Sequence, residues 1–356
     1  MIDLKQYGYI EREKPTQGTE PGRVITHQRD TYTLVTQHGE VIAKLTGNYL
    51  HRVKSCNAEY PCVGDFVLLQ YNNAGDSRIT GLLPRVSKFS RADFMGHSPG
   101  YAKAVKEQVV AANFDYVFIL SSLNQDFRTS RILRYLLQIR QSGGTPVIVL
   151  TKADLTCDYT QTLVELNNVE PDVPVCVVSS HTGYGLDDLN GFLAPGKTVV
   201  FLGMSGVGKS SLLNALMRTH VMAVNAIRED DDKGRHTTTH RELFMLPSGA
   251  MVIDTPGMRE LGLYDVSEAI STSYADIEAL FDKCRFKNCG HNTEPDCAVR
   301  EAIINGDLSQ ERWARYQAQT RENKFVDDRA SYMRDKRDGE KSIALYSKSL
   351  KSKKRK

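Results

Sequence analysis

The chain has 356 residues, of which 40% are hydrophobic and 25% are charged, and its formal net charge is +3. This composition is ordinary for a soluble globular protein, and the length suits two or three domains. No apolar run reaches the roughly 18–20 residues that span a bilayer, and residues 1–22 lack the apolar stretch of a secretion signal. We therefore expect a cytoplasmic protein with no membrane partner.

The positive charge is concentrated at the C-terminal end. Residues 341–356 carry seven basic side chains and no acidic one, so subtracting them from +3 leaves −4 for residues 1–340. A basic tail of this kind binds polyanions by releasing their counterions, and nucleic acid is the partner that it favours. The alternative is a solvated terminus that binds nothing.

The first 85 residues are expected to form an arm and a small β-domain. Residues 1–21 are polar and show no periodicity, which predicts a flexible N-terminal arm. From residue 23 to about residue 83, five short β-like runs are separated by turn signals. This pattern favours a small β-barrel of the OB-fold type over residues 22–85, and the alternative is another small β-domain such as an SH3-like barrel.

From about residue 105, apolar strands alternate with helical patterns, the first of them a helix expected over residues 103–114. This alternation predicts an α/β domain over residues 86–265, with a mainly parallel sheet that is covered on both faces. Past Gly262 the strands stop. Charged helical segments then predict a C-terminal α-helical domain over residues 266–340, which the basic tail follows.

A phosphate-binding motif lies inside the α/β region. Residues 203–210 read G-M-S-G-V-G-K-S, a complete G-x-x-x-x-G-K-[ST] between a strand and a helix. The glycines let the backbone wrap closely around phosphates, and the helix N-terminus directs N–H groups at their negative charge. Lys209 is expected to reach the β- and γ-phosphates, and the hydroxyl of Ser210 is expected to bind Mg²⁺.

Two segments after this loop complete the expected phosphate site. Asp254 and Gly257 belong to an Asp-Thr-Pro-Gly sequence that ends an apolar strand. A P-loop enzyme holds its second Mg²⁺ contact at such an Asp, and the N–H of Gly257 is well placed to sense the γ-phosphate. The polar residues 225–240 predict a switch loop, in which Thr237 or Thr238 supplies a hydroxyl to Mg²⁺.

The base is suggested by residues 151–154, Thr-Lys-Ala-Asp, directly after an apolar strand. They resemble the Asn/Thr-Lys-x-Asp motif of GTPases, in which the Asp carboxylate accepts hydrogen bonds from guanine and the Lys stem packs on the ring. Thr151 stands where most such enzymes have Asn, and its hydroxyl can still hold neighbouring loops by hydrogen bonds. Residues 179–183, which begin with Ser179 and Ser180, resemble the loop that approaches the guanine carbonyl.

The motifs occur in an unusual order along the chain. The base motifs precede the phosphate motifs, whereas in ordinary GTPases they follow them. The site can still assemble, because a parallel sheet brings strand ends together irrespective of chain order. The sequence therefore predicts a circularly permuted P-loop GTPase domain.

A cluster of cysteines lies in the expected helical domain. Cys284, Cys289, His291 and Cys297 fall within fourteen residues, in the pattern C-x4-C-x-H-x5-C. Three thiolates and one imidazole match a closed, tetrahedral zinc site of the structural type, which leaves no open position for catalysis. We expect one structural Zn²⁺ per chain. The alternative is a helical core that contains three reduced cysteines.

Taken together, residues from about 22 to about 335 strongly resemble the bacterial ribosome small-subunit-dependent GTPase A family, also called RsgA or YjeQ. The resemblance implies an OB-fold, a permuted GTPase domain and a zinc-binding helical domain. It also implies a role in late maturation of the 30S ribosomal subunit, with 16S rRNA as partner and with hydrolysis of GTP to GDP stimulated by the subunit. The expected oligomeric state is a monomer. The GTP contacts that it carries over are Thr151, Lys152, Ala153, Asp154, Gly203, Met204, Ser205, Gly206, Val207, Gly208, Lys209, Ser210 and Ser211.

The catalytic group is the open point of this interpretation. Ras-like enzymes orient the attacking water with a Gln directly after Asp-x-x-Gly, and here that position is Met258. Either His236 in the switch loop takes this role, or the ribosome completes the site. Competing hypotheses are a permuted GTPase that acts on another ribosomal particle, a GTP-switched RNA-binding scaffold, and an ATPase with a coincidental Thr-Lys-Ala-Asp.

Overall fold

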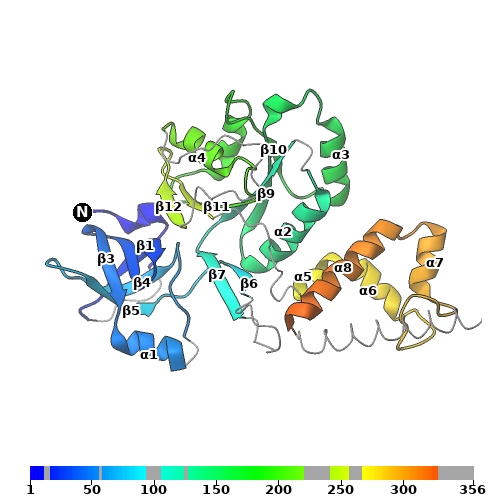
Figure 1. Ribbon diagram of the computed structural model, residues 1–356, viewed down its shortest axis with the longest axis horizontal. Coiled ribbons are helices and arrows are strands. Elements are labelled where there is room, and N and C mark those ends of the chain that lie inside the picture. Colours follow the sequence, from blue (N-terminus) through cyan, green and yellow to red (C-terminus); the bar gives the residue numbers. More distant parts are fainter. Residues whose placement is uncertain are drawn as a thin grey trace, which may run out of the picture. The chain divides into compact units, whose positions relative to one another are not determined.

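The structure is a computed structural model, and contacts divide the chain into two compact units (Figure 1). Unit 1 comprises residues 1–90 and 109–260, and unit 2 comprises residues 91–108 and 261–356. No helix in the described part of the chain is long and apolar enough to cross a membrane. The structure describes residues 1–11, 17–55, 58–93, 106–123, 127–219, 241–255 and 267–327.

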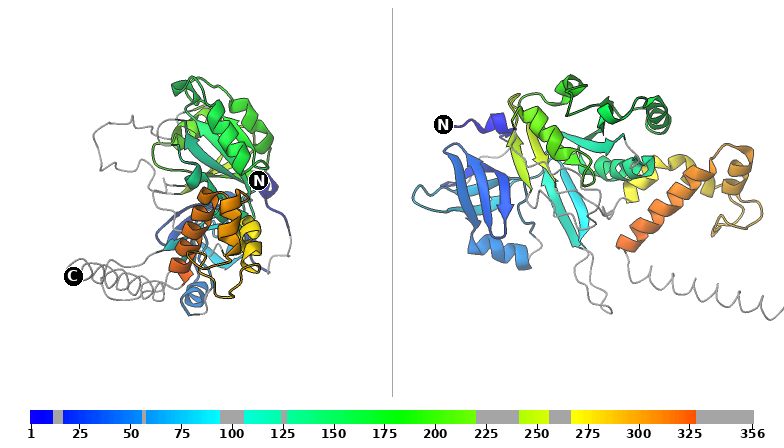
Figure 2. Two further views of the ribbon diagram at one scale, coloured as in Figure 1. Left: turned by 90° about the vertical axis from the view of Figure 1, so that its right-hand side faces the viewer. Right: turned by 45° about the horizontal axis from the view of Figure 1, so that its top comes forward.

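Unit 1 begins with a closed β-barrel whose strands follow the order β1-β2-β3-β5-β4, with a further β1–β4 pairing that closes it. Helix α1 (Gly47–Ser55) lies between β3 and β4 in the chain and packs against β5 at one end of the barrel (Figure 2). This arrangement confirms the expected OB-fold. The barrel strands are β1 (Glu20–Gln28), β2 (Thr31–Thr36), β3 (Gly39–Leu45), β4 (Phe66–Gln70) and β5 (Ser77–Leu82).

The segment before the barrel, for which the sequence predicts a flexible arm over residues 1–21, contains a short helix near its start. Leu4–Tyr7 forms a 3-10 helix, η1, which the side chain of Asp3 caps by accepting from the N–H of Lys5. Leu4 is buried, and burial of this side chain offsets the entropy that ordering the segment costs. β1 begins at Glu20, two residues before the predicted barrel boundary.

The second part of unit 1 is a sheet of order β10-β9-β8-β11-β13-β12, called here the GTPase sheet. All pairs are parallel except β12–β13, which is antiparallel. Such a sheet is covered on both faces, which explains why its strands read as continuous apolar runs. Its strands are β8 (Tyr116–Ser122), β9 (Thr145–Thr151), β10 (Val175–Val177), β11 (Thr198–Leu202), β12 (Glu242–Met245) and β13 (Met251–Asp254).

Helices cover this sheet as the alternating pattern predicted. α2 (Thr129–Ser142) packs on β8 and β9, and α4 (Lys209–Met217) contacts β13. α3 (Thr160–Val169) and two 3-10 helices, η2 (Ala153–Leu155) and η3 (Leu186–Phe192), connect the remaining strands.

One secondary-structure prediction is wrong. Residues 103–114 were expected to be helical, but the described part of this segment forms strand β7 (Lys106–Ala112), which pairs with β6 (Lys88–Asp93) in a separate two-stranded sheet. The β-branched Val109 and Val110 favour an extended backbone, and Val110 is fully buried. Packing and strand pairing therefore override the helical spacing of this segment.

A short ladder joins the barrel to the GTPase sheet. β1 lies antiparallel to β12, with Thr26 opposite Glu242, so both sheets run continuously into each other. The contact places the barrel beside the strand that follows the expected switch loop.

Unit 2 is helical in its described part from residue 267 onward, whereas residues 91–93 and 106–108 belong to β6 and β7. Its helices are α5 (Ser267–Ser273), α6 (Ala275–Phe281), α7 (Ala298–Asn305) and α8 (Gln310–Asp327). Residues 282–297, which contain the cysteine cluster, connect α6 to α7.

Candidate functional site

The phosphate loop lies at the carboxyl end of β11, between this strand and α4. Gly203, Gly206 and Gly208 have φ values of +156°, +79° and +103°, a region that other L-residues rarely adopt. A Cβ on Gly203 would lie 2.7 Å from the carbonyl oxygen of Leu120. The backbone path of this loop thus depends on glycine, as expected for a loop that wraps around phosphates.

Lys209 begins α4 and folds back over the loop. Its Nζ donates to the carbonyl oxygens of Gly203 and Met204, each at 2.8 Å. Burial lowers the pKa of Lys209 to about 8, and the charge of Asp254 acts in the opposite direction. The amine is therefore held within the loop, where the negative charge of a phosphate would restore its preference for the protonated form.

Asp254 ends β13 directly beside β11, opposite Phe201 in the parallel register. Its side chain is 1% exposed. Thr255, the next residue, donates from its hydroxyl to the carbonyl oxygen of Phe201 at 2.6 Å. This bond holds the end of β13 against the end of β11, so the carboxylate of Asp254 is positioned by the sheet.

Thr151 joins the base motif to the phosphate loop. Its hydroxyl donates to the carbonyl oxygen of Val207 at 2.6 Å, and the side chain is 2% exposed. The expectation that Thr151 could still hold neighbouring loops by hydrogen bonds is thus realised within the phosphate loop. Lys152 follows with a positive φ of 60°, which turns the chain at the end of β9.

The two base segments are also in contact with each other. The hydroxyl of Ser179 donates to Oδ1 of Asp154 at 2.5 Å and accepts from the backbone N–H groups of His181 and Thr182. The bond from Ser179 holds the pKa of Asp154 below its usual range. The carboxylate is exposed, charged and fixed in direction, which suits it to accept hydrogen bonds from a base.

The remaining predicted residues divide into two groups. Ala153 donates its N–H to the carbonyl oxygen of Val178, and the half-buried Ser180 follows Ser179 in the same loop. Ser210 and Ser211 lie in the first turn of α4. The other group lies outside the described residues and comprises His236, Thr237, Thr238, Gly257 and Met258.

The sequence analysis missed two residues of α2 that lie beside the phosphate loop. Arg131 and Tyr135 line a cavity of about 250 Å³ together with Lys152 and residues 204–207. The amphipathic pattern of α2 identifies a buried face but does not indicate which loop that face meets. Only the order β9-β8-β11 brings α2 to the phosphate loop.

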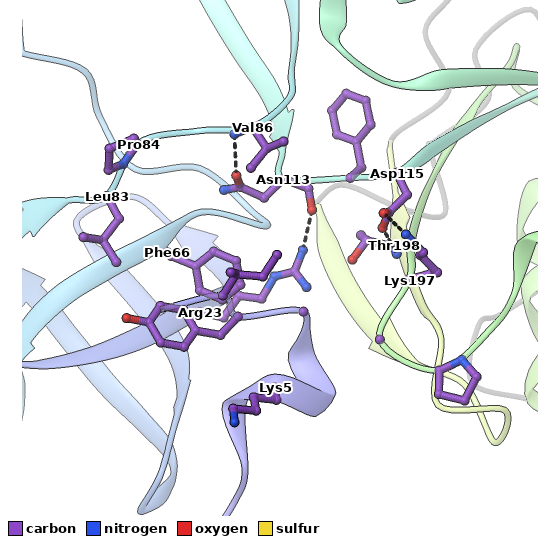
Figure 3. Close-up of a pocket in the computed structure, with 16 residues that line it drawn as sticks. Lys5, Arg23, Phe66, Leu83, Pro84, Val86, Asn113, Asp115, Lys197 and Thr198 are labelled. Atoms are coloured by element: carbon purple, nitrogen blue, oxygen red, sulfur yellow. Dashed lines mark hydrogen bonds and ion pairs between the residues drawn. The ribbon is translucent and has the colours of Figure 1, made fainter. Parts of the chain in front are cut away.

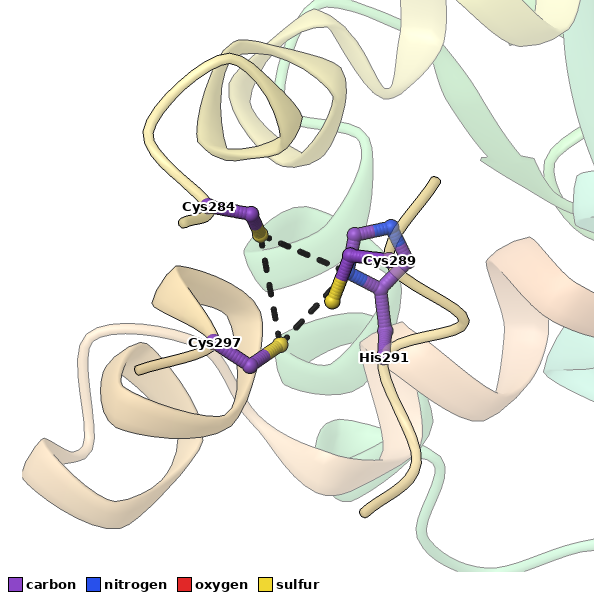
Figure 4. A group of neighbouring side chains, drawn as sticks. All are labelled: Cys284, Cys289, His291 and Cys297. Carbon is purple, nitrogen blue, oxygen red and sulfur yellow. Dashed lines mark hydrogen bonds between the residues drawn. The ribbon is translucent and has the colours of Figure 1, made fainter. Parts of the chain in front are cut away.

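In unit 2, the cysteine cluster forms as predicted (Figure 4). The ligand atoms of Cys284, Cys289, His291 and Cys297 all lie within 4.8 Å of one another. The Sγ atoms of Cys284 and Cys297 are 4.0 Å apart, and Nδ1 of His291 lies 3.6 and 3.5 Å from them. In a tetrahedral site with metal–sulfur bonds of about 2.3 Å, neighbouring ligand atoms lie about 3.8 Å apart. The four residues therefore fit a tetrahedral metal ion.

The surroundings of the cluster hold its histidine in place. Phe281 stacks on the ring of His291 at a centroid distance of 4.4 Å, and Trp313 meets the ring edge-on at 5.7 Å. The carboxylate of Glu294 accepts from the N–H groups of Gly290, Asn292 and Thr293. Together with its own backbone N–H, these donors lower the pKa of Glu294 to about 2. The loop is thus tied together around the cluster.

Comparisons with known proteins agree with this geometry. The sequence profile of the family described as RsgA GTPase matches residues 83–264. A protein of Listeria innocua named small ribosomal subunit biogenesis GTPase RsgA 1 is 41% identical over 322 residues, which cover 90% of this chain and 89% of that protein.

Two solved structures are similar to the fold. The crystal structure of YjeQ from Thermotoga maritima has a TM-score of 0.58 at 26% identity, and the match covers 85% of this chain and 97% of that one. YloQ, described as a circularly permuted GTPase, has a TM-score of 0.55 at 24% identity over 90% of this chain and 99% of its own. At that identity the second structure bears on the fold alone.

Proposed function

This chain belongs to the RsgA GTPase family, and we propose that it hydrolyses GTP to GDP and phosphate on the small (30S) ribosomal subunit, whose late maturation it assists. The observation that carries the proposal is that the phosphate and base motifs meet at the carboxyl ends of β9 and β11, where the hydroxyl of Thr151 donates a hydrogen bond to the carbonyl oxygen of Val207. The choice of subunit is supported by the name of the Listeria innocua relative, which refers to biogenesis of the small ribosomal subunit.

The proposal assigns each nucleotide group to a part of the site. Residues 203–211 cradle the phosphates, and Lys209 leaves the carbonyls of its own loop to meet the β- and γ-phosphates. Asp154 accepts hydrogen bonds from guanine, Lys152 packs on its ring, and Ser179 with Ser180 approaches the carbonyl. Adenine has no matching pair of donors for Asp154, so this assignment selects GTP over ATP.

Mg²⁺ fits the hydroxyl of Ser210 and the buried carboxylate of Asp254, with Thr238 and Gly257 of the switch segments completing the phosphate contacts. Bound there, the ion would neutralise charge that develops between the β- and γ-phosphates. We further propose His236 as the group that orients the attacking water, because Met258 has no polar atom suited to this task.

For unit 2 we propose one Zn²⁺ per chain, held by Cys284, Cys289, His291 and Cys297. A donor set of three thiolates and one imidazole binds zinc in preference to harder cations such as Mg²⁺ and Ca²⁺. Four protein ligands leave no open position, so the ion would have a structural role.

The partner proposal extends to 16S rRNA. An OB barrel and the seven basic side chains of residues 341–356 are two features that favour RNA, the first by base contacts and the second by charge. We propose a monomer in which residues 22–85, 86–265 and 266–340 are the three domains, with residues 1–21 and 341–356 at the ends.

The test is GTP hydrolysis by the purified protein alone, with 30S subunits and with 50S subunits, at matched salt. We expect low intrinsic turnover that 30S subunits alone raise, and we expect His236→Ala to remove this stimulation without changing affinity for GTP. Stimulation by 50S subunits only would transfer the activity to another ribosomal particle. Binding to 30S with no stimulation would leave a GTP-switched RNA-binding scaffold.

A further inference from the structure

A cavity of about 300 Å³ lies in unit 1 at the junction of the barrel and the GTPase sheet (Figure 3). Its walls come from the N-terminal segment, from Phe66 and Leu83 of the barrel side, and from Asp115, Lys197 and Thr198 at the amino ends of β8 and β11. The nucleotide motifs lie at the opposite, carboxyl ends of these strands. Five residues of β11 at about 3.3 Å each separate the two ends by roughly 17 Å.

A buried cation lines this cavity. Arg23 of β1 is 1% exposed. Its guanidinium donates to the carbonyl oxygens of Tyr7, Gly64 and Asn113 and to the sulfur of Met251. In the described part of the chain, the hydrogen bonds from this guanidinium go to uncharged acceptors.

Burial changes the pKa of this guanidinium. It lowers the pKa of Arg23 to about 10, against the more distant charges of Asp115 and Asp65. A buried charge is normally paired. Among the described residues no carboxylate is hydrogen-bonded to this guanidinium, so an anion beside it would be stabilised.

The other charges around the cavity point to the same ligand charge. Its lining contains three cations, Lys5, Arg23 and Lys197, and the carboxylate of Asp115. Asp115 is already engaged, since Nζ of Lys197 lies 2.7 Å from its Oδ1. The excess charge is positive and favours an anion.

The rest of the lining is apolar and partly aromatic. Tyr9 and Phe66 have ring centroids 5.3 Å apart, the guanidinium of Arg23 lies 5.0 Å from the centroid of Phe66, and Phe114 and Val86 also line the cavity. Such walls accept a flat ring in offset or edge-on contact. The volume is at the small end of the range for ligand pockets and holds roughly ten to fifteen non-hydrogen atoms.

We propose that this cavity binds a small aromatic carboxylate, with its carboxylate at Arg23 and its ring against Phe66. The site is separate from the nucleotide site and does not depend on the ribosomal role of the chain. A ligand there contacts the barrel and the first residues of β11 at once, so it would hold the barrel against the strand that leads to the phosphate loop.

The test uses 2-naphthoate as the probe and 2-naphthamide as its neutral isostere, with the full-length protein saturated with GDP. Binding is followed by saturation-transfer NMR and calorimetry. We expect 2-naphthoate to bind with a Kd of about 1 mM or lower, and 2-naphthamide to bind at least about tenfold more weakly because it cannot form the charge-assisted pair. Equal affinities, no binding of 2-naphthoate, or its displacement by excess GDP would overturn the proposal.

One matched pair of variants and one further variant locate the site. Val86→Trp fills the rim of the cavity and should weaken 2-naphthoate at least about tenfold, whereas the matched Val164→Trp on the exposed side of α3 should leave it unchanged. Arg23→Gln should remove the preference for carboxylate over amide. Arg23 also donates hydrogen bonds to four groups of the fold, so Arg23→Gln could be unstable. In that case Val86→Trp alone tests the site, and wild-type affinity for 2-naphthoate in Val86→Trp would refute it.

Discussion

The GTPase sheet and the helical unit 2 gain their stability in different ways. β11 and β13 are buried at every position, and the sheet buries a continuous set of Val, Ile, Leu and Phe side chains between its helices. In unit 2, α6 and α7 have seven and eight residues, with one and two buried hydrophobic side chains. Helices shorter than about 12 residues are marginal by themselves in water.

The difference indicates where each unit is vulnerable. Removing apolar surface from water stabilises the sheet by about 25 cal/mol per Å², and this surface is spread over many residues. A single polar substitution at the carboxyl ends of its strands should therefore lower nucleotide affinity more than it lowers the stability of the fold. Unit 2 buries fewer and more scattered hydrophobic side chains, so on the proposed function a metal ion held by four side chains would supply part of its stability. The predictions below separate the two cases.

The largest effect is expected from Cys297→Ser. Binding of a structural zinc ion contributes on the order of 10 kcal/mol, which in small metal domains is folding free energy, and losing one of four ligands would remove part of it. Trp313 is the one tryptophan of the chain and lies 5.7 Å from the ring of His291. Its fluorescence should shift to that of an exposed ring, while GDP affinity is retained.

The matched control is Cys157→Ser, which alters an exposed cysteine of unit 1. It should leave the fluorescence of Trp313 unchanged. A chelator should reproduce the effect of Cys297→Ser on the wild-type protein. If Trp313 kept its native emission in Cys297→Ser, unit 2 would have a sufficient apolar core and the contrast would be wrong.

The second effect concerns function without unfolding. Lys209→Ala should weaken GTP and GDP by about 100-fold, since it deletes charge-assisted bonds to the phosphates. The melting temperature should not fall, because the variant also removes a buried amine. Lys197→Ala, at the other end of β11, is the control and should bind GDP normally. A large drop in thermal stability of Lys209→Ala would show that the loop needs this lysine to fold.

The third effect is a pH dependence of the same group. With a pKa of about 8 in place of the ordinary 10.5, Lys209 holds fewer protons in the folded protein than in the unfolded chain between these values. Its burial penalty is therefore present below pH 8 and is relieved as the pH rises through this window. Phosphate favours the charged amine, so GDP affinity should fall by up to about tenfold per pH unit above pH 8.

Calorimetry in two buffers of different ionisation heat checks this prediction. Nucleotide binding should take up a proton in the wild-type protein near pH 9, and Lys209→Ala should show no uptake. Uptake that persists in Lys209→Ala would assign the titration to another group.

The smallest effect is expected from Thr151→Val, which keeps the shape of the side chain and removes its hydroxyl. The carbonyl of Val207 loses its donor in a buried place, at a cost of about 1–3 kcal/mol, and GTP affinity should fall a few-fold. Thr156→Val removes an exposed hydroxyl that donates to the carbonyl of Asp158, and it should change stability by less than about 0.5 kcal/mol. Equal denaturation midpoints for both variants would contradict a structural role for Thr151.

Much of the site could be predicted because its signals are local. The phosphate loop needs glycines at fixed positions, and the four ligands of the cluster lie within fourteen residues. The apolar runs before Thr151 and Gly203 also follow from burial on both faces of a parallel sheet. These features are determined by residues that are close in sequence, so the sequence alone is enough to predict them.

Other features depend on contacts between distant residues. The bond from Thr151 to Val207 spans 56 positions, and Arg131 meets the phosphate loop only through the order of the strands. β7 reads as a helix until its pairing with β6 is known. Arg23 draws its partners from four separate segments, so the cavity beside it leaves no sequence signal.

The short ladder between β1 and β12 has a consequence for how the chain folds during synthesis. β12 is the edge strand of the GTPase sheet. An uncovered edge strand can pair with strands of other molecules, which leads to aggregation. N-terminal domains fold first on a growing chain. Because the barrel precedes the sheet in sequence, the cover for this edge is complete before β12 leaves the ribosome, and the GTPase sheet closes against a partner that is already folded.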